Sequence, residues 1–279
     1  MELSHFQDVS HGFSYTIGIK KVDLQPGGIL TFLPGESSQG TEHITKYQRQ
    51  QQTIETFETN LTLRFAPNEQ YYNGPKYRVP IPNKHPVFTL NYDKGYKNVF
   101  GSDYSYDRVT ARIFKRTYVS PLGYIDIDLD GSKLFGKVPY PLLNIPRANQ
   151  TYSYQVRGYN LMQYLEFVSD AYAGLSYAHY FNGFFMNKIP LIKKLKWRSM
   201  ITFKGLVGQI SEENDPENNE DLPDYSQNTT ALDHYIETSV GIGNIFSFLR
   251  LDLVKRWSQL DEPGVESGYA LRARVKIEF

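Results

Sequence analysis

The last residues of the chain alternate strictly between apolar and mostly charged positions. Counted back from the C-terminus, every second residue is apolar: Phe279, Ile277, Val275, Ala273, Leu271 and Tyr269. The residues between these six positions are Glu278, Lys276, Arg274, Arg272 and Ala270. A period of two indicates a β-strand that has one apolar and one polar face. The pattern therefore predicts a strand over about 267–279.

The same alternation recurs along most of the chain, whereas helical periodicity is scarce. Near the end, Leu249, Leu251 and Leu253 oppose Arg250 and Asp252. We expect eleven strands, at about 12–22, 28–33, 52–66, 86–94, 104–117, 120–129, 172–182, 195–209, 233–243, 247–257 and 267–279. The connection 67–85 has room for a further strand near 75–81.

These strands predict an all-β fold, an antiparallel transmembrane β-barrel with about 11–12 strands in this chain. Short and long connections alternate, and the final residue is a bare Phe, as in the closing strand of bacterial outer-membrane barrels. A soluble edge strand can show the same alternation. Because an odd number of strands cannot close an ordinary antiparallel barrel, we expect the C-terminal part of a larger one. The whole of 1–279 is expected to be one domain, with a long inserted loop at about 130–171.

The composition argues against some classes of protein. The mean hydropathy is −0.48 and there is no apolar run long enough for a membrane-spanning helix, but strand alternation hides hydrophobicity from such averages. The 30 acidic and 30 basic residues balance, which argues against a nucleic-acid partner. The N-terminus does not have the pattern of a signal peptide.

No catalytic, cofactor or metal site is predicted. The chain has no Cys, and its six His residues do not have the spacing of metal ligands. Ser176 and His179 form the closest Ser/His pair, but positions three apart on a strand face opposite sides. We therefore do not expect an enzyme.

The long loop contains the motif Val156-Arg157-Gly158-Tyr159, and five predicted strands follow it. In this respect the chain resembles the C-terminal barrel region of BamA-like outer-membrane proteins. The segment 160–205 also resembles uncharacterised outer-membrane barrels of Bacteroidota, Gram-negative bacteria, that carry an upstream carboxypeptidase-regulatory-like domain. The resemblance implies that the loop folds into the lumen, with Arg157 inserted, Gly158 in a tight turn and Tyr159 packing.

The chain departs from the BamA-like pattern at one position. The resemblance implies an acid near Gly205 that pairs with the loop arginine, but Lys204 stands there and should repel Arg157. Glu237 and Asp252 are the candidate partners on inward-facing positions. The alternative is that Arg157 is an ordinary solvated loop residue.

The resemblance implies a role in assembly or translocation of outer-membrane or surface components. The alternatives are a receptor or anchor barrel in a larger complex, and a soluble carbohydrate-binding β-sandwich. The expected partners are outer-membrane lipid and lipopolysaccharide, and the assembly machinery. That machinery would read a C-terminal signal by β-augmentation. The signal residues are Tyr269, Leu271, Val275, Ile277 and Phe279.

Lysines cluster in the stretch 188–196 around Ile189-Pro190-Leu191-Ile192. The stretch fits a contact with the inner-leaflet interface. An ordinary turn with snorkelling lysines fits it equally well.

Overall fold

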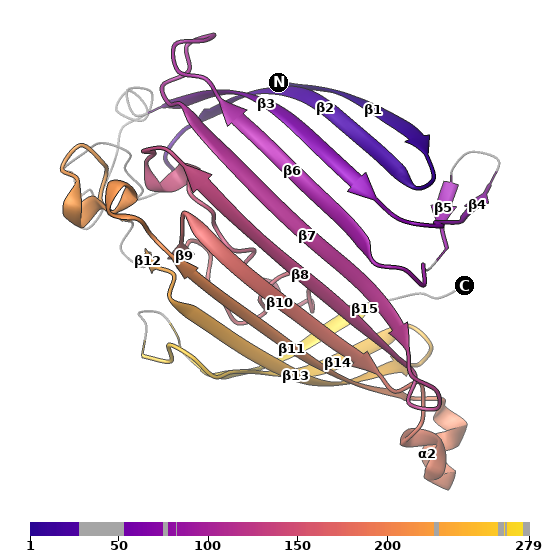
Figure 1. The fold of residues 1–279 in the computed structure, drawn as a ribbon. Helices are drawn as coiled ribbons and strands as arrows, with labels where there is room; N and C mark the ends of the chain where they lie inside the picture. The colour runs from indigo at the N-terminus through magenta and orange to yellow at the C-terminus, as the bar shows by residue number, and fades with distance from the viewer. Residues whose placement is uncertain are drawn as a thin grey trace.

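The computed structural model describes residues 1–27, 53–74, 78–81, 83–225, 229–261, 265 and 267–275. One large antiparallel sheet contains eleven of its strands (Figure 1). They are β1 (Glu2–Ser10), β2 (Phe13–Leu24), β3 (Ile54–Phe65), β6 (Val87–Gly95), β7 (Tyr106–Tyr118), β8 (Tyr124–Phe135), β10 (Ala171–Tyr180), β11 (Arg198–Gln209), β13 (His234–Ile245), β14 (Leu249–Arg256) and β15 (Tyr269–Val275). The sheet follows chain order, so each strand pairs with its neighbours in sequence.

The alternation of apolar and polar residues in the sequence predicted ten of these eleven strands. The exception is β1, whose apolar residues Leu3, Phe6 and Val9 recur every third position. The predicted strand at 28–33 lies outside the described residues. In the connection 67–85 the structure has a small hairpin, β4 (Tyr71–Asn73) with β5 (Arg78–Pro80), where one further strand was expected.

The sheet is strongly curved but open, so the prediction of a barrel is not met by these strands. In Figure 1, β14 and β15 curl behind β10 and β11, but the sheet ends at β1 on one side and β15 on the other. Ten successive antiparallel pairings separate these edges, so β1 and β15 run in the same direction. Direct closure would therefore require one parallel pair.

The two faces of the sheet have opposite character. On the convex outer face, Leu90, Ile113 and Leu129 lie on successive strands and are 44%, 39% and 43% exposed. On the concave inner face, Arg250 and Asp252 are buried. The two other sheets of the described residues have only two strands each, so no second sheet covers the outer face as a β-sandwich would require.

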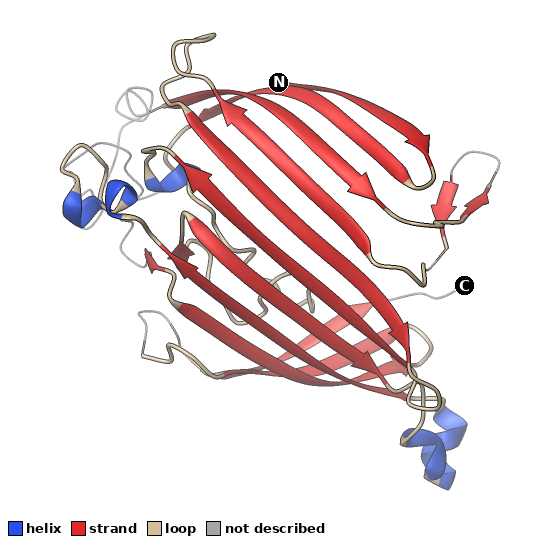
Figure 2. Cartoon of the chain, in the orientation of Figure 1, coloured by secondary structure: helices blue, strands red, loops and turns tan. Residues whose placement is uncertain are grey.

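The connections differ at the two ends of the sheet. One end has the compact turns 11–12, 119–123 and 246–248, and we call it the turn end. It also carries the β4–β5 hairpin and a helical segment with η2 (Met186–Lys188) and α2 (Pro190–Leu195), while η1 (Tyr140–Leu142), η3 (Glu212–Asn214) and η4 (Pro216–Asn218) lie at the other end (Figure 2). The longest described connection, 136–170, contains β9 (Phe167–Val168), which pairs with β12 (Thr230–Ala231).

This connection, which we call the inward loop, replaces the expected loop at 130–171 because β8 continues to Phe135. Two buried apolar clusters attach it to the inner face. One contains Tyr106 and Leu134 of the sheet with Leu142 and Leu143 of the loop. The other joins Met162 and Phe167 to residues of β11 and β13. Apolar burial therefore fixes both ends of the loop against the sheet.

Candidate functional site

The inward loop crosses the inner face and reaches the free edge of β15. The amide N of Tyr154 donates to the Ala273 carbonyl (2.7 Å), and the Ala273 amide donates to the Tyr152 carbonyl (3.0 Å). Ser153 and Ala273 form a parallel β-bridge. The loop therefore pairs, over a short stretch, with backbone groups of the edge strand that are left unpaired on that side by the sheet.

Lys204 of β11 holds the middle of the loop. Its ammonium group donates to the carbonyl oxygens of Gln155 (2.9 Å) and Gly158 (2.5 Å), and it lies 3.4 Å from a carboxylate oxygen of Glu237. The lysine is 3% exposed and Glu237 is 2% exposed. Lys204 thus binds the carbonyl of the motif residue Gly158 and that of the preceding Gln155, a role that the sequence did not predict. The expected repulsion between Lys204 and Arg157 stays a prediction.

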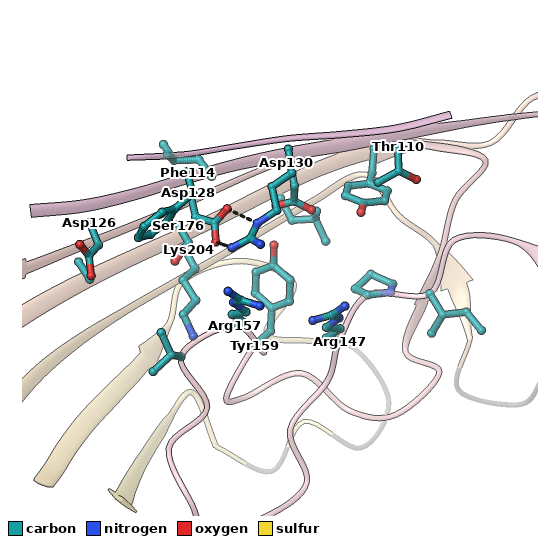
Figure 3. A pocket seen from close by; sticks show the side chains of 18 of the residues that line it. Thr110, Phe114, Asp126, Asp128, Asp130, Arg147, Arg157, Tyr159, Ser176 and Lys204 are labelled. Carbon is teal, nitrogen blue, oxygen red and sulfur yellow. Dashed lines mark hydrogen bonds and ion pairs between the residues drawn. The ribbon is translucent and has the colours of Figure 1, made fainter. Parts of the chain in front are cut away.

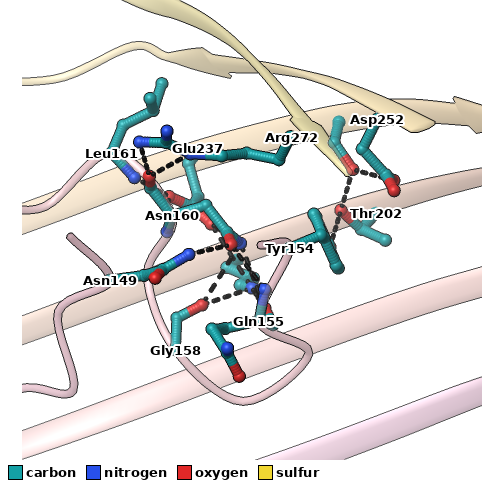
Figure 4. Close-up of polar contacts among 12 residues, drawn as sticks. Asn149, Tyr154, Gln155, Gly158, Asn160, Leu161, Thr202, Glu237, Asp252 and Arg272 are labelled. Carbon is teal, nitrogen blue, oxygen red and sulfur yellow. Dashed lines mark hydrogen bonds and ion pairs between the residues drawn. The ribbon is translucent and has the colours of Figure 1, made fainter. Parts of the chain in front are cut away.

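Glu237 of β13 binds the next two residues of the loop (Figure 4). Its carboxylate accepts from the backbone amides of Asn160 (2.8 Å) and Leu161 (3.2 Å), and from the Asn160 side chain. Arg272 of β15 donates from Nε and Nη2 to the Asn160 carbonyl, at 3.2 and 2.9 Å. Asn160 is fully buried, so strands β13 and β15 hold one loop residue from two sides.

A buried ion pair closes the far end of the loop. Arg256 of β14 donates from Nη2 to Glu166 Oε1 at 2.6 Å, and the two side chains are 0% and 3% exposed. Arg256 also donates to the carbonyls of Ser258 and Gln259. Glu166 in turn accepts from the Gln163 amide. The hydrogen bonds of both charges are thus largely internal, as burial requires.

Asp252 belongs to a second network of hydrogen bonds. Its carboxylate binds Arg250 through Nε and Nη2, at 2.6 and 2.7 Å, and accepts from Ser239. Ser239 contacts Thr202, whose hydroxyl contacts that of Tyr154 in the loop. Asp252 therefore supports the loop through intermediates, and together we call these loop contacts of β11, β13, β14 and β15 the latch.

Arg157 makes none of these contacts. Its side chain is exposed on the inner side, and within the described residues it has no hydrogen bond or ion pair with Glu237 or Asp252. The Glu237 and Asp252 carboxylates bind other groups, so the predicted pairing of Arg157 with one of them is wrong. Arg157 lies beside a cavity of about 370 Å³ that Arg147, Tyr159 and Lys204 also line (Figure 3).

The other motif residues have distinct surroundings. Tyr159 points toward β8, and its ring packs edge-on against Tyr235 with centroids 5.3 Å apart. Burial raises the pKa of the Tyr159 phenol above its ordinary value. A Cβ at Gly158 would lie 3.1 Å from the Arg147 carbonyl, so close packing accounts for this glycine. Val156 is exposed.

The C-terminal signal residues are described only in part. Tyr269, Leu271 and Val275 are 53%, 62% and 65% exposed on the outer face of β15. Ile277 and Phe279 lie outside the described residues. His179 binds the Leu122 carbonyl through Nε2 at 2.9 Å, and Ser176 instead lines the cavity, so these two residues do not form a pair.

Sequence reasoning did not identify Arg256, Glu166, Arg272 and Asn160 as members of the latch. The sequence did contain a signal for Arg256 and Arg272, which the strand alternation places on the inner face of β14 and β15. An arginine on that face needs a polar partner. Their partners could not be named, because Arg256 and Glu166 are 90 positions apart and Arg272 binds a backbone carbonyl.

Within the described residues, no helix has both the length and the apolar character needed to cross a membrane. No curated protein matches the chain. A family described as "Family of unknown function (DUF5686) C-terminal domain" matches residues 37–214, a range that includes the inward loop with Lys204 and ends before β13. Because this match covers more than half of the sequence, the chain belongs to the DUF5686 C-terminal domain family.

Proposed function

We propose that the sheet forms part of the wall of a β-barrel in a bacterial outer membrane. The observation that carries this proposal is the reversed polarity of the two faces. Outer-face residues such as Ile17, Val240 and Leu253 are 52%, 65% and 54% exposed, on strands far apart in the sheet. Apolar patches on soluble monomers rarely exceed roughly 300–600 Å². A lipid environment accounts for an apolar surface that extends over the whole sheet.

The inner face supports the same proposal. Arg112 binds Asp128 side-on, with Nε and Oδ1 2.6 Å apart, and Arg116 binds Asp126 in the same way at 2.6 Å. These four side chains remain partly accessible on the concave side. Charged pairs that keep contact with water are typical of a wet barrel interior.

Closure of this sheet into an antiparallel barrel requires further strands. Because β1 and β15 run in the same direction, an odd number of strands must lie between them to keep every pair antiparallel. We therefore place the described sheet in a larger barrel, whose remaining strands connect the edge at β15 to the edge at β1.

We further propose a BamA-like role, in which the barrel assembles or translocates outer-membrane or surface components. The support is the position of the inward loop, which covers Ala273 on the edge strand and is held by the latch. In this proposal the loop moves away from β15 during the working cycle and exposes a strand edge to an incoming strand. Outer-membrane lipid, lipopolysaccharide and the assembly machinery are the proposed partners.

A reversible cross-link between the loop and β15 tests this role. The chain contains no cysteine, so Ser153→Cys and Ala273→Cys introduce one pair at the backbone bridge. In cells that depend on the intact protein, oxidation should reduce the amount of newly assembled surface components, and a reductant should restore it. Each single substitution is a matched control.

Two outcomes distinguish a failure of the proposed role from a failure of the proposed membrane location. If the doubly substituted protein is cross-linked in the outer membrane and assembly continues unchanged, loop release is not needed and a receptor or anchor barrel is favoured. If the protein is absent from the outer-membrane fraction without any cross-link, the membrane location itself is wrong.

A further inference from the structure

The connection between β10 and β11 projects from the turn end of the sheet. It contains η2 and α2, and Figure 1 shows α2 extending beyond the strand ends. The neighbouring connections at this end, 119–123 and 246–248, are compact turns. We call residues 184–196 the knob. The knob contributes no residue to the latch or to the lining of the inner cavity.

The knob exposes large apolar side chains. Phe185, Ile189, Leu191 and Leu195 are 48%, 48%, 80% and 51% exposed. Four such residues in so short a segment form a cluster rather than isolated surface positions, and clusters of this kind mark contact with a partner or a membrane.

All charged side chains of the knob are positive. Lys188, Lys193, Lys194 and Lys196 are all exposed, and the sequence has no acidic residue between Asp170 and Glu212. None of the four lysines forms an ion pair with another described residue; Lys188 lies over the ring of Phe184 at 4.1 Å. The surface that covers the knob must therefore combine negative charge with an apolar layer.

The base of the knob is well packed. The Phe185 ring contacts Phe181 and Phe184, with centroids 4.9 and 5.0 Å apart. At the other end, the Asn244 side chain donates to the Lys196 carbonyl at 2.8 Å. The knob is thus held in one orientation relative to the sheet, with its apolar residues exposed.

Exposed aromatic residues lie at the same end of the sheet as the knob. At the turn end, Phe13, Phe65, Tyr118, Phe246 and Phe248 are 36%, 43%, 59%, 80% and 44% exposed. These residues come from four segments at the same end of the sheet: β2, β3, β7 and the turn 246–248. Aromatic side chains gather at the level of lipid headgroups in barrels. The knob projects from the same end of the sheet as these aromatic residues.

We propose that the knob docks on phosphate-bearing headgroups of the membrane leaflet at the turn end, with its lysines on the phosphates and Leu191 and Leu195 among the upper acyl chains. This inference rests on the proposed membrane location of the sheet. Interleaved lysines and exposed leucines fit an anionic lipid surface, because lysine stems lie along apolar surface while their ammonium groups reach the phosphates. Each lysine should shift the equilibrium between docked and free knob by about fivefold.

Fluorescent labels on the intact protein in vesicles test the inference. Leu191→Cys carries a polarity-sensitive dye, and a separate Leu90→Cys variant reports the outer face of the sheet. Vesicles contain either equal parts of phosphatidylglycerol and phosphatidylethanolamine, or phosphatidylcholine alone. In the anionic vesicles, nitroxide lipids should quench the label at position 191. Added salt, or Lys193→Gln with Lys194→Gln, should reduce that quenching.

The two labels distinguish the possible failures. If the label at 90 is quenched by lipid and the label at 191 stays in water in both vesicles, the knob does not dock on lipid and an acidic protein partner becomes the better explanation. If the label at 191 is quenched equally in both vesicles and is insensitive to salt, the phosphate contact is wrong. If neither label meets lipid, the proposed membrane location fails with it.

Discussion

Replacing Arg256 by methionine should destabilise the folded protein by about 3–5 kcal/mol, because it leaves the Glu166 carboxylate buried without its counter-charge. Arg256 is 0% exposed and its Nη2 lies 2.6 Å from Glu166 Oε1. The substitution also removes donors from the carbonyls of Ser258 and Gln259. Denaturant unfolding of the intact protein in detergent, followed by the fluorescence of the adjacent Trp257, measures the loss.

A double-mutant cycle separates the pair from the loss of arginine packing. Glu166→Gln keeps an acceptor for the Gln163 amide while it removes the charge. If the buried pair is the cause, the combined variant Arg256→Met with Glu166→Gln should be more stable than Arg256→Met alone. A cost of Arg256→Met below about 1 kcal/mol, the scale of an exposed pair, would contradict the assigned burial.

Replacing Lys204 by methionine should release the middle of the inward loop and cost a similar amount, about 3–5 kcal/mol. Lys204 donates to the Gln155 and Gly158 carbonyls and forms an ion pair with the buried Glu237 carboxylate, so its removal affects all three groups at once. Limited proteolysis of the folded protein should then cut within 152–158, while the sheet remains intact.

Arg157→Met is the matched control for this experiment. Arg157 lies in the inward loop that Lys204 holds, and its replacement also removes a positive charge. The Arg157 side chain makes no hydrogen bond within the described part of the chain. Its effect on the free energy of unfolding should stay within about 0.5 kcal/mol. Equal cleavage rates for Lys204→Met, Arg157→Met and the unaltered protein would show that Lys204 does not hold the loop.

The sequence predicts the sheet well because its signal is local. In β7 and β14, each residue alternates with its neighbours, and the faces of Ile113, Leu253, Arg250 and Asp252 follow directly from a period of two. β1 was not predicted, because an edge strand with few buried contacts does not need the alternation that identifies the others.

The latch was not predictable in the same way. Lys204 binds the carbonyls of Gln155 and Gly158, and backbone carbonyls carry no signal in the side-chain pattern. From charge alone, Lys204 is expected to repel Arg157, and Glu237 and Asp252 are then the candidate partners of Arg157. The motif located the right loop, but the contacts that hold it depend on the path of the backbone.

In the proposed barrel, the outer face of the sheet contacts lipid and the inner face contacts water. Leu90 and Thr89 are neighbours on β6, with Leu90 44% exposed on the outer face and Thr89 lining an inner cavity. Leu90→Cys and Thr89→Cys place the same fluorophore on each face of the intact protein in outer-membrane vesicles. Nitroxide lipid should quench only the label at 90, and aqueous iodide only the label at 89. Quenching of both labels by iodide, with no effect of the lipid quencher, would contradict the lipid contact of the outer face.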